Sequence, residues 1–470
     1  MTVVDPLYSR AITTPQQQFL MTPTESWTYL KIERTVNQMI AYCSTLGITA
    51  GTKVAIFAYN HPYYLLWVLA LTRVGAIIIF CHARLSLTAV IRQLKTIGIP
   101  FLITDNEATI DDITTIPLVP SLNQSQTMPP VLELDREHSI FFSSGTTGEP
   151  KAICLTLANH YYSAVGVLSR LQVAKSDGAW LLCLPLFHVG ALAILWRCLW
   201  GGLAIYLHDR FDPSQVIQTV QNHRIGWVSL VPTMLVRILD HPLFLESLLV
   251  WQKMRGILVG GAPLSPCLQD RCLALQLPIV TTYGLTEAAS TVTTLTATEW
   301  RAHPHSAGTV IPGLAMSIEA GQIKIRGRSV FLRYLHQQAR DDWFNTKDVG
   351  YIDGDGYLVV CDRSDNLIIC GGENIYPAEI ENLLSRHPHI QDVCVVGKAD
   401  REWGQIPVAI VQSKYDLSLP DIREFCLAHH LAPYKIPKQL LNWSALPKTA
   451  TGKTDRAAIC KLIACHPDRE

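Results

Sequence analysis

The sequence predicts an α/β protein. It would have a large N-terminal domain of mostly parallel sheets covered by helices, with a β-rich segment, and a small α+β C-terminal domain. The chain has 470 residues, more than one hydrophobic core usually serves, so we expect at least two domains. Helical and strand patterns alternate from Tyr29 to about residue 320, which is typical of parallel sheets. After a hairpin signal at Tyr351–Val360 the pattern changes, and about 100 residues remain, enough for a small domain.

The alternation is clearest near the N-terminus. Lys31–Gly47 has the apolar spacing of a helix, and Gly51–Phe57 combines a turn with a buried strand. Tyr63–Gly75 predicts a second helix and Ala76–Phe80 a second strand. Residues 115–130 are rich in Pro, Ser and Gln, which favours a surface loop.

The C-terminal part has a different order of elements. A boundary at residues 362–365 would separate an N-terminal domain (1–361) from a C-terminal domain (366–470). The patterns in the second domain predict two helices, at 377–386 and 419–430, and three strands, at 391–397, 406–412 and 437–442.

The composition excludes several classes of function. The chain has 39 Lys and Arg and 39 Asp and Glu, so neither a basic nucleic-acid surface nor a polybasic membrane anchor is expected. The apolar share of 49% fits a globular protein with large cores and argues against disorder.

Cysteine usage and the N-terminus predict a cytoplasmic protein. The 13 cysteines form no Cys-x-x-Cys pair, which favours buried thiols in a reducing compartment. The first ten residues, MTVVDPLYSR, contain Asp5 and Pro6 and no apolar core segment, so no signal peptide is expected. The oligomeric state stays open, and a homo-oligomer is among the alternatives.

One apolar stretch, residues 181–207, approaches the length of a membrane span. However, His188 and Arg197 lie inside it, and Pro185 and Gly190 interrupt it. Because a charged Arg near the centre of a bilayer is costly, we expect a strand, a loop and a buried helix instead of a span.

The densest cluster of chemically useful residues is the segment SSGTTGEPK at 143–151, directly after the apolar run at 139–142. It lacks the spacing of a Walker P-loop, because Lys151 is followed by Ala152. Glycine turns, hydroxyls and a lysine can still hold phosphate, although a solvated turn is the alternative. The candidate phosphate ligands are Ser143, Ser144, Gly145, Thr146, Thr147, Gly148 and Lys151.

Four further segments are weak signals when each is taken alone. In Thr281–Glu287, Glu287 could hold Mg²⁺ beside phosphate, or Thr286 could merely be a helix N-cap. In Trp343–Gly350, Asp348 could bind ribose hydroxyls or make an Asx turn. Gly371–Glu381 is a glycine turn before a helix, and Pro447–Lys453 could be an ordinary basic tail.

Taken together, and in this order, the motifs make the chain resemble the adenylate-forming enzymes, a family of acyl-CoA synthetases, adenylation domains and luciferases. The resemblance runs from about Trp27 to Arg456. It implies ATP, Mg²⁺ and CoA as cofactors or co-substrates, and a small-molecule carboxylic acid as substrate. It also implies that the C-terminal domain is mobile.

The resemblance assigns roles on the nucleotide side. The segment Gly260-Gly261-Ala262-Pro263 would lie beside adenine, with Tyr283 stacked near it and Gly284 in the same motif. Thr286 would contact the adenylate phosphate and Glu287 the Mg²⁺, while Asp348 and Arg363 would hold the ribose. One departure is visible, because Lys347 stands where the family motif Thr-Gly-Asp has glycine, which leaves the local loop geometry in question.

The resemblance also implies two reaction steps. Attack of the acid on the α-phosphate of ATP would form an acyl-adenylate, with Lys453 and Mg²⁺ neutralising the charge that builds up. A thiol would then displace AMP, reaching the acyl group past Gly371 and Gly372. Since one pocket cannot present both Lys453 and a thiol channel, Asp365 is expected to be the pivot of a domain rotation.

The segment Leu184–Arg197 bears on the choice of acid. His188 would lie at the mouth of the acid pocket, or it could be a packed core histidine. Arg197 stands in an apolar run and needs a partner, which could be an internal carboxylate or a carboxylate of the substrate. The segment resembles the o-succinylbenzoate–CoA ligases of menaquinone and phylloquinone biosynthesis, whose substrate carries two carboxylates.

Three alternative functions stay open. They are a ligase for another aryl or medium-chain acid, a stand-alone enzyme that loads a carrier protein, and a non-catalytic binding protein. The intact Glu287 and Lys453 argue against the last of these.

Overall fold

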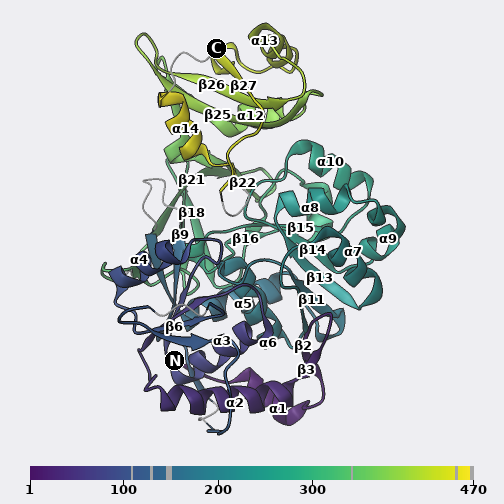
Figure 1. Cartoon of the computed structure of the whole chain (residues 1–470). Coiled ribbons are helices and arrows are strands. Elements are labelled where there is room, and N and C mark those ends of the chain that lie inside the picture. The colour runs from purple at the N-terminus through teal and green to yellow at the C-terminus, as the bar shows by residue number, and fades with distance from the viewer. Residues whose placement is uncertain (107–109, 128–130, 144–150, 340–341, 450–453, 466–470) are drawn as a thin grey trace.

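The computed structural model describes residues 1–106, 110–127, 131–143, 151–339, 342–449 and 454–465. Figure 1 shows a large body built from the chain up to β22 (Leu358–Arg363) and a smaller lobe built from the remainder. Mixed sheets and helices form the large body, and an α+β arrangement forms the lobe. The predicted α/β fold class is therefore confirmed.

The first large sheet has the strand order β20-β10-β9-β5-β4-β6-β7 among the described residues. The strands from β9 to β7 run parallel, whereas β10 and β20 are antiparallel to their neighbours at one edge. The bounds are β4 (Lys53–Phe57), β5 (Ile77–Phe80), β6 (Phe101–Thr104), β7 (Thr114–Pro117), β9 (Glu137–Ser143), β10 (Lys151–Thr156) and β20 (Arg333–Tyr334).

The second large sheet has the described order β17-β16-β15-β14-β13-β11-β12-β2-β3, with a parallel centre and antiparallel edges. Its bounds are β2 (Gln18–Met21), β3 (Ser26–Thr28), β11 (Ala179–Leu182), β12 (Ile205–Leu207), β13 (Ile225–Leu230), β14 (Gly256–Val259), β15 (Ile279–Tyr283), β16 (Thr293–Thr294) and β17 (Thr309–Val310). A short pair of β1 (Thr2–Val4) and β8 (Val131–Glu133) lies outside both sheets.

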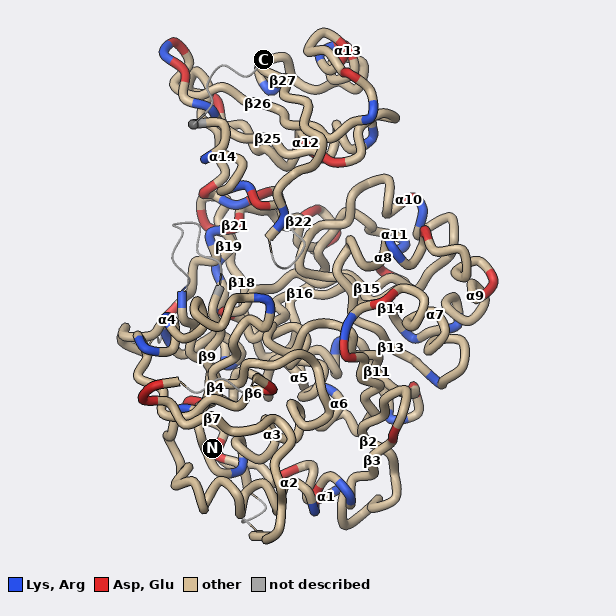
Figure 2. The backbone as a smooth tube through the Cα atoms, in the orientation of Figure 1, with Lys and Arg blue, Asp and Glu red and all other residues tan. Residues whose placement is uncertain are grey.

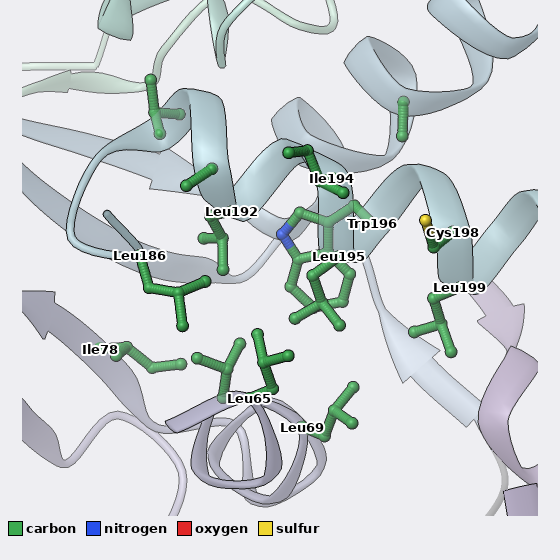
Figure 3. Packing of buried hydrophobic residues seen from close by; sticks show 14 of the residues in the cluster. Leu65, Leu69, Ile78, Leu186, Leu192, Ile194, Leu195, Trp196, Cys198 and Leu199 are labelled. Atoms are coloured by element: carbon green, nitrogen blue, oxygen red, sulfur yellow. The ribbon is translucent and has the colours of Figure 1, made fainter. Parts of the chain in front are cut away.

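Helices cover the sheets, and two of them meet in the largest core cluster. Figure 3 shows Leu65 and Leu69 of α3 facing the side chains of Leu192 and Leu195 of α6. The bounds are α1 (Pro6–Thr13), α2 (Tyr29–Thr45), α3 (Pro62–Val74), α4 (Leu87–Ile97), α5 (Leu157–Arg170), α6 (Val189–Gly201), α7 (Pro213–Asn222), α8 (Pro232–Leu239), α9 (Leu243–Gln252), α10 (Pro266–Ala274), α11 (Ala297–Ala302), and the 3₁₀ turns η1 (Lys175–Asp177) and η2 (Thr286–Ala288).

The β-rich segment is an antiparallel sheet with the order β18-β19-β21-β22, and it leads directly into the small lobe. Two hydrophobic clusters consist entirely of residues from Ile368 onward, so the small lobe has its own core. The bounds are β18 (Leu314–Glu319), β19 (Gln322–Gly327), β21 (Phe344–Ile352), η3 (Ser364–Asn366), β23 (Ile368–Cys370), β24 (Glu373–Ile375), α12 (Pro377–Leu384), β25 (Ile390–Asp400), β26 (Gly404–Ser413), α13 (Leu419–Ala428), η4 (Pro433–Lys435), β27 (Gln439–Trp443) and α14 (Arg456–Cys465).

Most predicted elements are confirmed within two or three residues. The helix expected at Lys31–Gly47 is α2, and the apolar stretch at 181–207 forms a strand, a loop and the buried helix α6. The surface loop predicted at 115–130 is partly wrong, because its first residues form the edge strand β7 and Ile116 is buried. In the described part of the chain, no helix has both the length and the apolarity needed to cross a membrane.

Candidate active site

The segment predicted to bind phosphate connects β9 and β10. Ser143 and Lys151 are register partners at the end of this antiparallel pair, so the connection starts and ends at one point of the sheet. The predicted residues Ser144, Gly145, Thr146, Thr147 and Gly148 lie outside the described residues. Lys151 is half-buried, and its ammonium nitrogen lies 5.6 Å from the centre of the Tyr334 ring.

Glu287 lies in a 3₁₀ turn beyond the carboxyl end of β15. Its Oε1 accepts a hydrogen bond of 2.9 Å from the Tyr334 hydroxyl, and its backbone carbonyl accepts one of 2.7 Å from the Phe331 amide. The alternative in which Thr286 is a helix N-cap is wrong, since Leu285 occupies that position and makes no capping bond. Gly284 is required here because a Cβ atom would lie 1.7 Å from the Ser290 carbonyl oxygen.

Tyr283, Asp348 and Arg363 come together from three strands. The Tyr283 hydroxyl donates to Asp348 Oδ2 at 2.6 Å, and Arg363 Nη1 lies 3.4 Å from Asp348 Oδ1. Burial, together with the negative charge of Asp348, raises the pKa of Tyr283, so the phenol remains a hydrogen-bond donor at neutral pH. The Asp348 carboxylate is thus directed toward these two side chains.

The Asx turn suggested for this region is made by a different residue. Asn345 Oδ1 accepts a 2.8 Å bond from the Lys347 amide, and Thr346 Oγ1 accepts one of 3.1 Å from the Asp348 amide. Lys347 has φ = 65°, in the left-handed region where glycine is favoured. The loop therefore keeps the shape that a glycine motif would give, with a lysine in the strained position.

The glycines predicted to lie near adenine stand beside the Tyr283 segment. Gly260 follows β14, and a Cβ atom there would lie 2.3 Å from the Thr282 hydroxyl of the neighbouring strand. Gly261 has φ = 82°, which glycine adopts without strain, and Ala262 and Pro263 continue the loop toward α10. The carboxyl ends of β14 and β15 thus form one edge, which is where ligands bind in open α/β sheets.

His188 and Arg197 lie at the start and toward the end of α6. His188 is the N-cap residue, and its ring contacts Phe187 and His82, with centroid distances of 4.5 and 5.6 Å. Arg197 has only 1% of its surface exposed. Its Nη2 donates to Thr291 Oγ1 at 2.9 Å, and its guanidinium carbon lies 5.6 Å from the centre of the Trp180 ring.

Arg197 forms no ion pair with any Asp or Glu of the described chain, and its Nε has no hydrogen-bond partner there. Burial lowers the pKa of Arg197 to about 10, which still leaves the group charged at neutral pH. The alternative of an internal carboxylate partner is therefore wrong for the described residues. Thr291 follows Glu287 by four residues, so Arg197 points toward the loop that carries Glu287.

The residues predicted to form the hinge and the thiol channel lie where β22 meets the small lobe. Asp362 accepts bonds from the amide of Arg363 at 2.7 Å and from that of Ala378 at 2.8 Å. Asp365 lies 3.5 Å from Arg363 Nη2 and 3.6 Å from Lys347 Nζ. Gly371 and Gly372 have φ values of 60° and 85°, and a Cβ at Gly371 would lie 2.7 Å from the Trp403 ring. Lys453 lies outside the described residues.

Sequence reasoning missed Tyr334 and Thr291, which contact Glu287 and Arg197. Neither residue stands in a motif with recognisable spacing. The pairing of β20 with β10, which brings Tyr334 close, joins residues about 180 positions apart. A candidate partner for Arg197 could have been sought among hydroxyls near Glu287, because the sequence provides no acid next to that arginine.

Comparison with known proteins identifies the family to which the chain belongs. A model of AMP-binding enzymes matches residues 7–335, and a model of their C-terminal domain matches residues 379–453. The chain belongs to the AMP-binding enzyme family. The resemblance to adenylate-forming enzymes inferred from the motifs is thereby confirmed.

Relatives within the AMP-binding family cover nearly the whole chain. A 2-succinylbenzoate–CoA ligase of Listeria monocytogenes serotype 4b (strain F2365) is 32% identical over 461 residues, which is 96% of this chain and 97% of that protein. The o-succinylbenzoate CoA synthetase of Bacillus subtilis in complex with its acyl-adenylate intermediate superposes with a TM-score of 0.89, at 29% identity and 98% coverage of both chains. The same enzyme with ATP and a magnesium ion gives a TM-score of 0.86 at 30% identity, covering 97% and 99% of the two chains.

The residues around Glu287 fit a magnesium ion held together with ATP. No group of three or more His, Cys, Asp or Glu side chains in the described chain could hold a metal alone. Mg²⁺ commonly takes one or two carboxylates together with substrate phosphates, so one well-placed carboxylate suffices. Glu287 has this chemistry and shares Tyr334 as a neighbour with Lys151, the residue that ends the phosphate segment.

Proposed function

We propose that this AMP-binding enzyme is an ATP-dependent acid–CoA ligase that converts o-succinylbenzoate to o-succinylbenzoyl-CoA in menaquinone or phylloquinone biosynthesis. Its relatives over the full length carry that activity in their names. The observation that supports this choice of acid most directly is the buried arginine Arg197, which has no carboxylate partner in the described chain.

The burial of the Arg197 charge favours an anionic partner. A buried charge without a partner is expensive, and a hydroxyl such as that of Thr291 compensates it only in part. A guanidinium fits a carboxylate with two parallel hydrogen bonds. An acid with two carboxylates supplies one group for activation and one for Arg197, as o-succinylbenzoate does.

The first reaction step joins two anions. A carboxylate oxygen attacks the α-phosphorus of ATP, a P–O bond forms, and pyrophosphate leaves. We assign Thr286 to the adenylate phosphate, Glu287 to Mg²⁺, and Lys453 to the meeting carboxylate and phosphate. When bound, Mg²⁺ supplies positive charge at the phosphates. The segment Ser143–Lys151 would hold the phosphates of ATP.

We assign the remaining nucleotide contacts to residues around β15, and the geometry there supports this assignment. Asp348 and Arg363 would bind the ribose, with Tyr283 directing the Asp348 carboxylate and lying near adenine. The loop Gly260–Pro263 would border the base. His188, at the N-terminus of the helix that carries Arg197, would lie at the mouth of the acid pocket.

The second step forms the thioester. The thiol sulfur of CoA attacks the acyl carbonyl, and AMP leaves with the bonding electron pair. We assign Gly371 and Gly372 to the path of the thiol. We further propose that residues 1–361 and 366–470 are separate domains, that Asp365 in the segment 362–365 is the pivot, and that the small domain rotates between the two steps.

The assignment can be tested by pyrophosphate release across aromatic and aliphatic mono- and dicarboxylic acids, with and without CoA. We expect the highest kcat/KM with o-succinylbenzoate and a thioester product when CoA is present. A clear preference for a monoacid would favour a ligase for another aryl or medium-chain acid. Adenylate formation without any CoA thioester would favour an enzyme that loads a carrier protein.

Arg197→Met provides the sharper test, because methionine keeps the apolar bulk and removes the charge. Losing one partner of a buried charge pair costs roughly 2–5 kcal/mol, so kcat/KM for o-succinylbenzoate should fall about 30-fold or more. A monoacid analogue without the ring carboxylate should lose little, and the KM for ATP should barely change. Measuring both acids on both proteins gives the coupling energy directly.

Arg170→Met is the matched control, because it removes an arginine that already has a carboxylate partner. Arg170 Nη2 lies 2.7 Å from Glu299 Oε1. It should lower thermal stability while affecting both acids equally. A coupling energy near zero for Arg197→Met would refute the assignment of Arg197 to the second carboxylate.

We also propose that the enzyme works in the cytoplasm. The cysteines whose side chains are described are all free, and most are buried. Burial raises the pKa of several of these thiols, for example that of Cys81 to about 12. Thiols of this kind are suited to a reducing compartment. A homo-oligomer is compatible with this proposal and would be detected by sedimentation.

A further inference from the structure

Tyr334 stands at the edge of the first large sheet and touches the two functional segments on either side of it. It belongs to the two-residue strand β20, in which it pairs with Ile153 of β10. Its hydroxyl donates to Glu287 Oε1 at 2.9 Å, and the Lys151 ammonium lies 5.6 Å from its ring centre. The ring therefore lies between the end of the phosphate segment and the candidate magnesium carboxylate.

The backbone fixes the position of Tyr334 on both sides. The Leu332 amide donates to the Cys154 carbonyl at 3.0 Å and the Leu335 amide to the Ala152 carbonyl at 2.8 Å, which attaches the segment to β10. The Phe331 amide donates to the Glu287 carbonyl at 2.7 Å. Phe331 is buried and meets the Tyr334 ring edge-on at 4.8 Å. Segment 331–335 thus holds both the backbone and the side chain of Glu287.

A tyrosine hydroxyl on one carboxylate oxygen restricts the rotation of the glutamate side chain. Among the described residues, nothing donates to the other oxygen, Oε2. Carboxylates that bind metals are commonly held in this way by a neighbouring donor, and removing the donor typically weakens metal binding 10- to 100-fold. The Lys151 ammonium over the ring face adds a weaker cation–π contact that keeps the ring in place.

We propose that Tyr334 is a positioning residue for the magnesium-binding carboxylate of Glu287, acting in adenylate formation and not in thioester formation. This inference rests on the proposed function, in which ATP and Mg²⁺ meet at Glu287. Tyr334 itself needs no contact with substrate or metal. The hydroxyl orients Glu287, and the ring links that carboxylate to the end of the phosphate segment.

Tyr334→Phe removes the hydroxyl and keeps the ring. With ATP present, the affinity for Mn²⁺, measured by electron paramagnetic resonance as a substitute for Mg²⁺, should fall about tenfold or more. The Mg²⁺ concentration that gives half-maximal adenylate formation should rise by a similar factor, while the rate at saturating Mg²⁺ largely recovers. Thioester formation from pre-made acyl-adenylate should stay unchanged, which a general structural defect would not produce.

Two further variants make the outcome decisive. Tyr206 is a buried residue of β12 whose hydroxyl lies 3.3 Å from His223 Nε2. Tyr206→Phe removes this hydroxyl and should leave Mn²⁺ affinity as in the wild type. Glu287→Gln should weaken Mn²⁺ binding at least as much as Tyr334→Phe does. If Glu287→Gln weakens binding and Tyr334→Phe does not, the positioning role is wrong and the proposed function stands. If neither variant changes Mn²⁺ affinity, both the metal assignment and the role of Tyr334 are wrong.

Discussion

Two buried arginines in this protein have opposite surroundings. Arg73 is held by Asp5 at 2.5 Å and by Glu33 at 2.5 and 3.0 Å, and these acids help raise the pKa of Arg73 although burial opposes them. Arg197 is more deeply buried than Arg73, but it has a threonine hydroxyl and an aromatic face instead of carboxylates, and burial lowers its pKa. Because Arg73 already satisfies a structural role with carboxylates, the contrast supports a ligand as the missing partner of Arg197.

Two buried histidines provide a residue-scale prediction about pH. His138 Nε2 lies 2.8 Å from the Thr72 hydroxyl and its Nδ1 has no partner in the described chain. Burial lowers the pKa of His138 to about 3, and it also lowers that of its neighbour His160. The contribution of neutral His138 to stability is therefore complete above the unfolded pKa of about 6.5 and is lost as pH falls toward 3.

His138→Asn should lower stability at pH 7.5 but flatten the acid side of the profile. Between pH 6 and 4 the slope of the unfolding free energy should decrease by about 1.4 kcal/mol per pH unit, because one fewer group takes up a proton on unfolding. Urea unfolding at several pH values measures this slope. The exposed His305→Asn should leave it unchanged. An unaltered slope in His138→Asn would show that His138 does not remain neutral in the folded state.

At this scale the sequence predicted residues better than their contacts. The apolar run around Arg197 predicts a buried side chain that needs a partner, and its burial is confirmed. The sequence left open whether an internal carboxylate or the substrate would be that partner, and no Asp or Glu of the described chain pairs with it. The hydrogen bonds of Tyr334 and Thr291 were not predictable, since each depends on how distant strands and loops meet. Local patterns carry no information about such long-range pairings.

Among the elements, β21 contains the clearest conflict between sequence and backbone. Lys347 adopts φ = 65° within β21, and its side chain reaches Asp365 at 3.6 Å. A non-glycine residue in this conformation is strained by about 1–2 kcal/mol. The ion pair is half-exposed, and exposed pairs usually contribute about 1 kcal/mol or less.

Lys347→Gly should therefore stabilise the protein slightly, by roughly 0.5–1 kcal/mol, since the relieved strain exceeds the added entropy of the unfolded chain. Thermal unfolding at low and high salt measures the effect. Lys347→Ala is the control, because it removes the same ion pair and retains the strain, so it should be neutral or destabilising. A glycine variant that is less stable than the alanine variant would contradict the strain argument.

The long elements were predictable and the short ones were not. Helices such as α2 and α3 carry several turns of apolar periodicity, and the hairpin of β21 and β22 is marked by Asp-Gly turns. The Pro, Ser and Gln residues around the edge strand β7 predict a loop there, and so they hide the strand. Strands as short as β16 and β20 have too few residues to show alternation, and their partners define them.

On the scale of the whole molecule, polar contacts run from the end of β15 to the segment 362–365. Tyr283 bonds Asp348, Asp348 lies near Arg363, and Arg363 lies near Asp365, at 2.6, 3.4 and 3.5 Å. Figure 2 shows acidic and basic residues intermixed between β22 and the small lobe. In this view neither positive nor negative residues predominate in the large body or in the small lobe. Arg363 thus contacts Asp348 through Nη1 and Asp365 through Nη2, so one side chain links the two carboxylates.

The change of pattern after the hairpin signal at 351–360 predicts two bodies, whereas the sequence does not predict the orientation of the small lobe. Orientation depends on a few contacts, such as the bond from the Ala378 amide to Asp362. Each part has its own core. Two bodies with separate cores are compatible with the proposed rotation of the small domain.

Asp365→Pro tests that rotation. Proline fixes φ near −65° and restricts the preceding Ser364 as well, so the linker should hold only one orientation of the small domain. We expect one half-reaction to fall by about two orders of magnitude while the other stays measurable, because misplacing a catalytic group by an ångström can cost that much. Rapid-quench measurement of adenylate formation and of thioester formation from pre-made adenylate separates the two steps.

Asp365→Ala is the control, because it removes the contacts with Lys347 and Arg363 but leaves the backbone free. Both of its half-reactions should therefore remain within a few-fold of wild type. Wild-type rates for both steps in the proline variant would place the pivot elsewhere in the segment 362–365 or beyond it.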